Sequence, residues 1–280
     1  MRSAIYIFIF GTFCLSAQDD PNSVFKNPAL YVDPCGGLLM LNKRPVPEAY
    51  NREADVAWEK RIWRDLDLRD KLNQPLYFPI DNQPCRISLF QLVTKHILTG
   101  EIIAFGDEEF YRPFSLSEAR SKLVQEQEIT EIIYDSAGNE YPRVIKSFDS
   151  TSIFSSVIRV RMKEDWYLNS GRSDIEVRIV ALGFYAYIEE KEAYKELFWV
   201  FFPAIKQVLA KYRVFNPRNA EDYSSFDDLF TRREFSSLII KETNVYDRYI
   251  ADYCKGIDAL MESDRIKNDL FKYEHDLWDY

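Results

Sequence analysis

Apolar side chains spaced four residues apart predict a first helix between residues 53 and 72. The stripe consists of Ala54, Trp58, Ile62 and Leu66. This spacing places the four side chains on one face of a helix. Two further helices are predicted from their N-terminal caps. The first begins after Ser88, and the second follows a capping box formed by Ser115 and Glu118.

The C-terminal part of the chain has the same helical spacing. Ser225 and Asp228 predict a capped helix through Phe235. From Asn244 onward we expect one long helix, or two helices with a kink near Gly256 or Ser263. Its apolar positions are Ile250, Tyr253, Ile257 and Leu260, followed by Ile266, Leu270, Tyr273 and Leu277. Because the stripe shifts between the two halves, we do not expect a regular coiled coil.

The middle of the chain has the patterns of β-strands. Two hairpins are predicted, residues 129–134 with 140–145 and residues 157–168 with 175–187. Short strands are predicted at residues 101–105 and 197–202, and Pro203 then begins a helix to Tyr212. Antiparallel hairpins between helical ends predict an α+β fold. Its order is N-terminal helices, central antiparallel β hairpins and C-terminal helices.

The first 17 residues have the pattern of a signal peptide rather than of a buried strand. A single arginine is followed by a nearly unbroken apolar run over residues 4–13, and Ala17 precedes an abruptly polar stretch. The run is too short to span a bilayer stably. We expect cleavage after Ala17. Because bulky Phe13 precedes Cys14, we do not expect a lipid on that cysteine.

Residues 18–52 have the features of an extended, proline-rich arm. The segment contains five prolines and the pair Gly36-Gly37, without helical periodicity. Few apolar residues are available to anchor it, so we expect it to become ordered only against a partner. Residues 53–280 are then expected to form a single α+β domain.

Composition narrows the range of functions. The 280 residues carry a formal net charge of −9 and have a pI near 5.0, unlike a nucleic-acid-binding protein. Two histidines and nine scattered glycines leave no basis for a histidine-built metal site or a glycine-rich phosphate loop. Aromatic residues, which often anchor protein interfaces, make up 15% of the chain. We therefore expect no catalytic residue, no cofactor and no metal.

Two acidic clusters are candidates for chemistry. The first consists of Asp65, Asp67 and Asp70. It lacks the glycine of a calcium loop, and nearby arginines and lysines favour ion pairs on a solvated helix face. In the second, Glu164 and Asp165 lie beside Trp166, a combination used by glycosidases. Without a further motif, we interpret this pair as a chance arrangement in an acidic, aromatic-rich chain.

The histidines and cysteines also give no catalytic pattern. His96 lies on the apolar face of its predicted helix and is interpreted as a core or boundary residue. His275 and Asp276 match the residue types of a metal-phosphohydrolase pair, but the sequence offers no companion residues for such a metal site. After cleavage at Ala17 three cysteines remain, namely Cys35, Cys85 and Cys254. At most two of them can pair within the chain, and the spacing does not determine which.

Seven segments, in order, resemble the GldN/PorN family of the Bacteroidetes type IX secretion and gliding machinery. They are Trp63-Arg-Asp-Leu-Asp-Leu-Arg-Asp-Lys71 with Pro75-Leu-Tyr-Phe-Pro79, Lys163-Glu-Asp-Trp166, Leu197-Phe-Trp199 with Pro203, Phe215-Asn-Pro-Arg-Asn219, Ser225-Phe-Asp-Asp-Leu-Phe230, Lys241-Glu-Thr-Asn-Val-Tyr-Asp-Arg248 and Glu274-His-Asp-Leu-Trp278. Each segment is weak alone, but their common order over residues 55–280 makes the resemblance specific.

The resemblance implies a non-enzymatic periplasmic protein held at the outer membrane by a lipoprotein of the GldK/PorK type. It implies self-association with that lipoprotein into a ring. It also implies a link to the GldL–GldM inner-membrane motor through a GldM/PorM-like periplasmic component, and a requirement for secretion and gliding. No nucleic acid is expected as a partner. A ring needs heterologous contacts that close, and we expect them on residues 18–52 and on the C-terminal helix.

Two other functions remain open at this stage. An exported glycan-binding or glycan-cleaving protein could use Trp166, Trp199 and nearby acids, and it would bind or hydrolyse sugars as a monomer. A periplasmic chaperone for cargo would bind its cargo transiently and would not bind an outer-membrane lipoprotein stoichiometrically.

Overall fold

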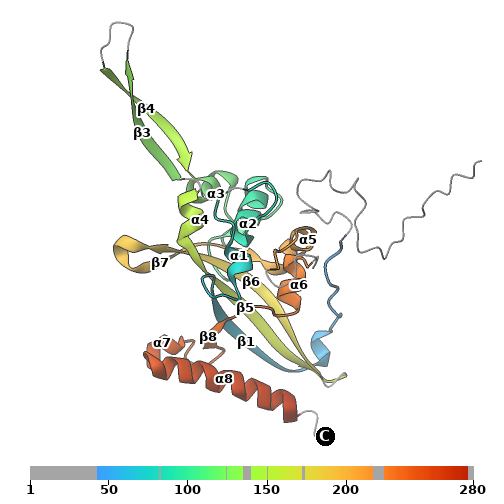
Figure 1. Ribbon diagram of the computed structural model, residues 1–280. Helices are drawn as coiled ribbons and strands as arrows, with labels where there is room; N and C mark the ends of the chain where they lie inside the picture. The colour runs from blue at the N-terminus through green and yellow to red at the C-terminus, as the bar shows by residue number, and fades with distance from the viewer. Residues whose placement is uncertain are drawn as a thin grey trace, which may run out of the picture. The chain divides into compact units, whose positions relative to one another are not determined.

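The computed structural model describes residues 43–276, apart from residues 82, 124, 135–139, 150, 172–173 and 217–223. All of the described residues belong to one compact unit, Gly37–Tyr280. Three predicted features lie outside the described residues: the signal peptide with its cleavage site after Ala17, most of the arm, and the connection between the strands predicted at 129–134 and 140–145. The mixed α+β fold predicted from the sequence is confirmed for the part of the chain that is described (Figure 1).

A six-stranded antiparallel sheet organises this unit, with strand order β2-β7-β6-β5-β1-β8. The strands are β1 (Val56–Asp67), β2 (Ala104–Phe105), β5 (Val157–Asn169), β6 (Asp174–Ile188), β7 (Ala193–Phe201) and β8 (Leu238–Glu242). The predicted hairpin of residues 157–168 and 175–187 is therefore the β5–β6 pair in the middle of the sheet. The other predicted hairpin forms a separate two-stranded sheet of β3 (Gln125–Tyr134) and β4 (Glu140–Asp149).

The predicted helix over residues 53–72 is wrong, because most of this segment is strand β1. A spacing of four residues places side chains on one face of a strand as well as of a helix. Trp58 and Ile62 accordingly pack in the same apolar cluster. Both edges of β1 are paired, one with β5 and the other with β8. These pairings with distant segments stabilise the strand, and the local pattern gives no sign of them.

Six helices enclose the larger of the apolar cores together with the sheet. They are α1 (Gln74–Tyr77), α2 (Leu89–Leu98), α3 (Leu116–Leu123), α4 (Thr151–Ser156), α5 (Phe202–Lys211) and α6 (Phe226–Thr231). Leu92 and Leu209 from the helices join Met162 and Phe184 from the sheet in this core. The predicted caps are confirmed, since Ser88 and Ser225 form capping boxes and Ser115 exchanges hydrogen bonds with Glu118.

A smaller core lies between the sheet and the last two helices, α7 (Ile250–Tyr253) and α8 (Ile257–Asp276). Ile62 and Ile239 of the sheet contact Ile266 and Leu270 of α8 there. The predicted break near Gly256 is confirmed, and this glycine has a φ of +58°, in the left-handed region. The predicted helix start at Asn244 is wrong, because residues 244–249 form a loop. The predicted helix through Phe235 ends early, at Thr231, with Arg233 at a φ of +57°.

Gly183 shows how closely the sheet packs. A Cβ atom at this position would lie 2.7 Å from the ring of Trp199 on the neighbouring strand β7. Trp199 is only 1% exposed, so its indole ring cannot move outward. The glycine is therefore needed for the close approach of the ring to the backbone of β6.

Residues 43–51, at the end of the predicted arm, lie against the α+β unit itself. Lys43 forms an ion pair with Asp228, and the backbone N–H of Val46 donates to Asp227 over 2.7 Å. Lys206 of α5 donates to the carbonyl of Val46 over 3.1 Å. The expectation that the arm orders only against a partner therefore does not hold for this portion. Residues 18–42 lie outside the described part.

Candidate functional site

Six exposed apolar or aromatic side chains lie on the loop at residues 244–249, on α7 and on the first turns of α8. They are Val245, Tyr246, Tyr253, Ile257, Leu260 and Met261, here called the C-terminal patch. Val245 is 98% exposed and Ile257 is 75% exposed. A group of exposed apolar side chains marks a protein contact site in soluble proteins when the side chains form one continuous surface.

Asn244 shapes the loop that carries the first two residues of the patch. Its side-chain Nδ2 donates to the carbonyls of Glu242 over 2.8 Å and of Arg248 over 2.9 Å. Its Oδ1 accepts from the backbone N–H groups of Tyr246 and Arg248. An asparagine that satisfies four backbone groups fixes a loop as a hydrogen-bonded turn. The loop therefore presents Val245 and Tyr246 to solvent in a defined conformation.

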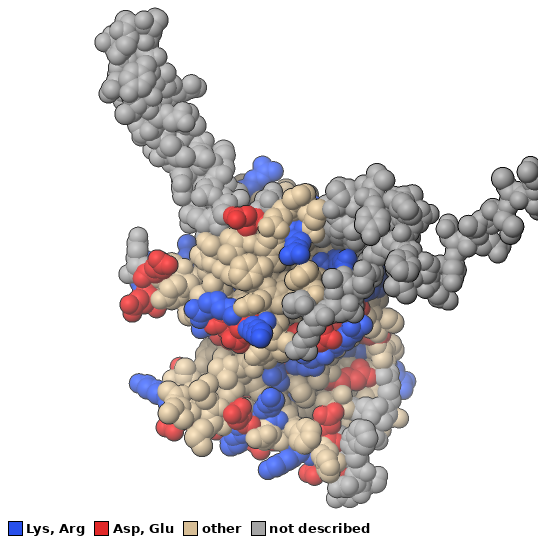
Figure 2. All heavy atoms as spheres, in the orientation of Figure 1, with Lys and Arg blue, Asp and Glu red and all other residues tan. Residues whose placement is uncertain are grey.

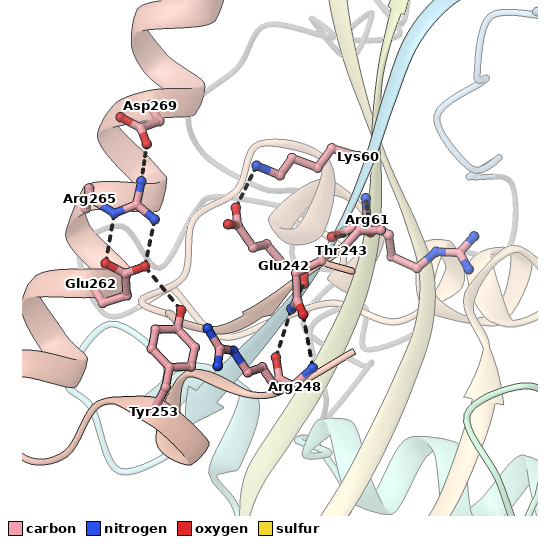
Figure 3. A network of polar contacts seen from close by, with 10 residues as sticks. Lys60, Arg61, Glu242, Thr243, Arg248, Tyr253, Glu262, Arg265 and Asp269 are labelled. Atoms are coloured by element: carbon pink, nitrogen blue, oxygen red, sulfur yellow. Dashed lines mark hydrogen bonds and ion pairs between the residues drawn. The ribbon is translucent and has the colours of Figure 1, made fainter. Parts of the chain in front are cut away.

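Contacts at the two ends of this loop join it to the sheet and to α7 (Figure 3). Lys60 of β1 forms an ion pair of 2.6 Å with Glu242, and the Thr243 hydroxyl donates to the carbonyl of Arg61 over 3.1 Å. The guanidinium of Arg248 lies 4.9 Å from the ring of Tyr246 and 4.4 Å from that of Tyr253. Arg248 thus fills the space between two aromatic members of the patch.

Two charged residues of α8 hold α7 in place. The Tyr253 hydroxyl donates to Glu262 over 3.1 Å, and Arg265 donates to both Glu262 and Asp269 (Figure 3). The hydrogen bond from Arg265 lowers the pKa of Glu262 below its usual value, so the carboxylate stays charged. Exposed ion pairs contribute little stability individually. Their effect here is to fix the geometry of the patch.

A cleft of about 460 Å³, here called the α8 cleft, lies beside the patch. Its walls include Arg64, Trp166, Arg233, Phe235, Lys267 and Phe271. Glu164 is fully buried behind it and accepts from Arg64 Nε over 2.9 Å and from Trp166 Nε1 over 3.0 Å. The Arg233 Nη2 atom lies 2.8 Å from Glu164 Oε1. Burial lowers the pKa of Arg64, and the nearby Glu164 carboxylate opposes this effect.

Glu164 and Asp165 do not act together as a carboxylate pair. They are successive residues of β5, so their side chains point to opposite faces of the sheet. Asp165 binds Arg61, whereas Glu164 binds Arg64. Trp199 is buried and offers no platform for a sugar. The structure therefore does not assemble the glycosidase-like arrangement considered from the sequence.

The other acidic and histidine candidates have structural partners. Asp65 binds Arg161 over 2.8 Å, and Asp67 binds Arg69 over 2.6 Å. The local ion pair expected from the sequence is confirmed for Asp67 and Arg69, whereas Asp65 pairs with a distant arginine of β5. The predicted helix face is wrong, because Asp65 and Asp67 belong to strand β1. His96 contacts Glu101 through Nδ1 and the Tyr212 hydroxyl through Nε2, which confirms it as a boundary residue.

The cysteines differ in state. Cys85 is disulfide-bonded, whereas Cys254 is free. Within the described part, no group of three His, Cys, Asp or Glu side chains is arranged to hold a metal ion. Over the same residues, the helices are all too short or too polar to cross a bilayer.

The sequence indicates only part of this candidate site. Its shifted apolar stripe favours the C-terminal helix as a contact surface, which stays a prediction. Residues 266 and 270 of that stripe are indeed buried, whereas Ile257 and Leu260 are exposed. The sequence pattern places residues 244–249 in the helix and so does not predict the loop that they form. The signal was present, because asparagine favours turns over helix interiors.

The fold and the candidate site define an α+β protein with a group of exposed apolar side chains, a feature that is typical of protein-binding surfaces. Comparison with known families makes this more specific. The model of one family, described as "Gliding motility associated protein GldN", matches residues 51–279. The chain belongs to the GldN family, as the seven sequence segments indicated. No curated protein matches the chain individually.

Proposed function

We propose that this protein is a non-enzymatic structural subunit of the type IX secretion and gliding machinery. In this proposal it resides in the periplasm after cleavage of its signal peptide behind Ala17. It builds a ring with copies of itself and with an outer-membrane lipoprotein of the GldK/PorK type. The ring contacts the GldL–GldM motor, and the part of the motor that it contacts is the GldM/PorM-like periplasmic component. Membership of a gliding-motility family over residues 51–279 is the observation that carries the proposal.

The physical requirement of a closed ring supports this reading. Head-to-tail contacts use two different surfaces on each subunit. The C-terminal patch provides one such surface. A second group of exposed side chains, Phe78 and Phe215, lines a separate cleft of about 420 Å³, with the Arg86 guanidinium 3.9 Å from the Phe215 ring. Partly exposed aromatic rings stacked with arginine are typical anchors of protein interfaces.

The charge of the surface is also consistent with this proposal. Positive and negative side chains are interspersed on the visible face rather than gathered into one field (Figure 2). Together with the net charge of −9, this disfavours nucleic acid as a partner. Apolar contacts and local ion pairs then determine which partner is bound.

A double substitution in the patch tests the proposal. We expect Val245→Ser with Tyr246→Ser to reduce recovery of the lipoprotein or of neighbouring copies with a tagged subunit, and to reduce secretion and gliding. The reason is the loss of two exposed apolar anchors without loss of a buried group. The matched control is Leu116→Ser, which removes an exposed apolar residue from α3. Unchanged complex recovery and unchanged secretion in the double variant would remove the patch from the proposal.

A further inference from the structure

The strongest unexplained feature of the molecule is the pair of arginines in the α8 cleft. Arg64 is only 6% exposed, yet just its Nε atom donates a hydrogen bond, to Glu164. Within the described residues, neither Nη atom of Arg64 donates a hydrogen bond. Unused donors on a buried cation are unfavourable unless water or a ligand satisfies them.

The charges around the cleft do not balance. Arg64, Arg233 and Lys267 face two carboxylates, Glu164 and Glu274. Lys267 forms no ion pair within the described part of the chain. The cleft therefore keeps a local positive charge in a protein whose net charge is −9. An anionic group that enters it meets donors already held in position.

The backbone at Arg233 is also unusual. Its φ of +57° lies in the left-handed region, which a non-glycine residue seldom adopts without compensation. This conformation places the guanidinium 5.7 Å from the Trp166 ring and 5.5 Å from the Phe235 ring. Arg64 lies 5.7 Å from the same Trp166 ring. Two arginines thus flank one indole ring, with their positions fixed by aromatic contacts and by Glu164.

Helix α8 connects this cleft to the C-terminal patch. Ile257, Leu260, Lys267, Phe271 and Glu274 follow spacings of three, seven, four and three residues, which place them on one stripe of the helix. Leu260 and Lys267 are seven residues apart, which corresponds to about 10 Å along the helix axis. A single extended segment can therefore contact the exposed apolar turn and the cleft at the same time.

From this geometry we infer that the α8 cleft binds a carboxylate side chain of an acidic, apolar-flanked peptide segment in a partner protein. The aspartate or glutamate of that segment accepts hydrogen bonds from the free Nη atoms of Arg64 and from Arg233 and Lys267. Its apolar residues contact Phe271 and the C-terminal patch. A carboxylate suits the site because arginine binds it with two parallel hydrogen bonds.

A peptide is favoured over polyanionic partners on electrostatic grounds. A membrane rich in anionic lipid or a nucleic acid would be repelled at long range by the net charge of −9. A short acidic segment instead meets the positive charge of the cleft locally, and its apolar residues meet the aromatic walls. The inference goes beyond the proposed function, because binding of a peptide to the purified chain can be measured without the machinery.

The test uses the full mature chain and a fluorescein-labelled six-residue peptide that alternates phenylalanine or leucine with aspartate. Its twin carries asparagine at every aspartate position. By fluorescence anisotropy at low salt, we expect the acidic peptide to bind at least about tenfold more tightly than the twin, as loss of charge-assisted hydrogen bonds implies. We expect Arg233→Gln and Lys267→Gln each to weaken acidic-peptide binding by a similar factor.

Matched controls keep the outcome specific. Arg232→Gln and Lys272→Gln remove exposed cations next to the cleft residues in sequence but outside the cleft, and they should change the affinity less than about twofold. Circular dichroism checks that each variant is folded. Equal binding of the two peptides, equal loss in the control variants, or no binding at all would overturn the inference. So would binding of inorganic phosphate or anionic vesicles in place of the peptide. The proposed function is tested by a different experiment, the recovery of a complex from membranes. A negative result in the peptide assay would therefore overturn this inference and leave the proposed function standing.

Discussion

At the scale of single residues, neighbours in sequence take on different tasks because a strand alternates its faces. Lys163 is 2% exposed and binds Glu109 over 2.7 Å on one face of β5, whereas Glu164 binds Arg64 on the other face. One four-residue segment of the family resemblance, Lys163-Glu-Asp-Trp166, therefore contributes to both faces of the sheet. This double role explains in physical terms why charged residues lie in the centre of a buried strand.

The close contact at Gly183 gives a prediction about stability. We expect Gly183→Ala to destabilise the fold by about 1–3 kcal/mol, because the added methyl group would overlap the buried Trp199 ring. The measurement is urea unfolding followed by tryptophan fluorescence. Gly171→Ala is the control, since that glycine is exposed and its added Cβ meets only the Asn169 side chain. Equal stability of wild type and Gly183→Ala would show that the two strands are packed less closely than described.

Buried tyrosines give a prediction about pH. Burial, and then the hydrogen bond to Glu176, raise the pKa of Tyr167 to about 12. Its pKa in the unfolded chain is about 10. The folded protein thus retains a proton that the unfolded chain releases, so this stabilisation is full below pH 10 and is lost as pH rises toward 12.

Unfolding midpoints in urea between pH 8 and pH 11 test this dependence. We expect the midpoint to fall above pH 10, and we expect Tyr167→Phe to fall less steeply than wild type. An identical decline in both proteins would mean that Tyr167 does not contribute to the alkaline transition.

At the scale of elements, the sequence predicts the helices and strands that are determined by residues close to them along the chain. The capped helices after Ser88 and Ser225 and the β5–β6 hairpin follow from nearby residues, and they form as expected. The prediction of a helix at strand β1 is wrong, because the spacing of four residues fits both structures. What distinguishes them is pairing with β5 and β8, roughly 100 and 180 residues away along the chain.

The candidate site was predictable only in part for the same reason. The C-terminal helix and its break at Gly256 follow from local pattern. The α8 cleft requires Arg64, Trp166, Arg233 and Lys267, which come from four separate segments, to meet in space. No spacing along the sequence indicates such a meeting. It depends on the strand order of the sheet.

The contact between residues 43–51 and α5 gives a prediction for one element. Lys206 donates to the Val46 carbonyl over 3.1 Å and to Glu48 over 2.6 Å. We expect Lys206→Met to speed amide hydrogen exchange at Val46 by about tenfold, because two charge-assisted contacts are lost. Lys211→Met, at the exposed end of the same helix, is the control. If exchange at Val46 were unchanged in Lys206→Met, this segment would be held by other contacts.

At the scale of the whole molecule, the two largest apolar cores of the described residues have different roles. The larger core joins α1–α6 to the middle of the sheet, whereas the smaller one holds α7 and α8 against β1 and β8 (Figure 1). The smaller core fixes α8 with one stripe inward and leaves another stripe exposed. An anchored helix with a free apolar stripe is well suited to bind a partner without rearranging the fold.

In the proposed function, this protein works as one subunit of a membrane-attached assembly. The most direct measurement is purification of a tagged chain from native membranes under mild conditions, followed by size analysis and quantitative mass spectrometry. We expect a large complex that contains many copies of the chain and an outer-membrane lipoprotein in a fixed ratio to it. Recovery of the chain as a free monomer without a stoichiometric partner would contradict the proposed function.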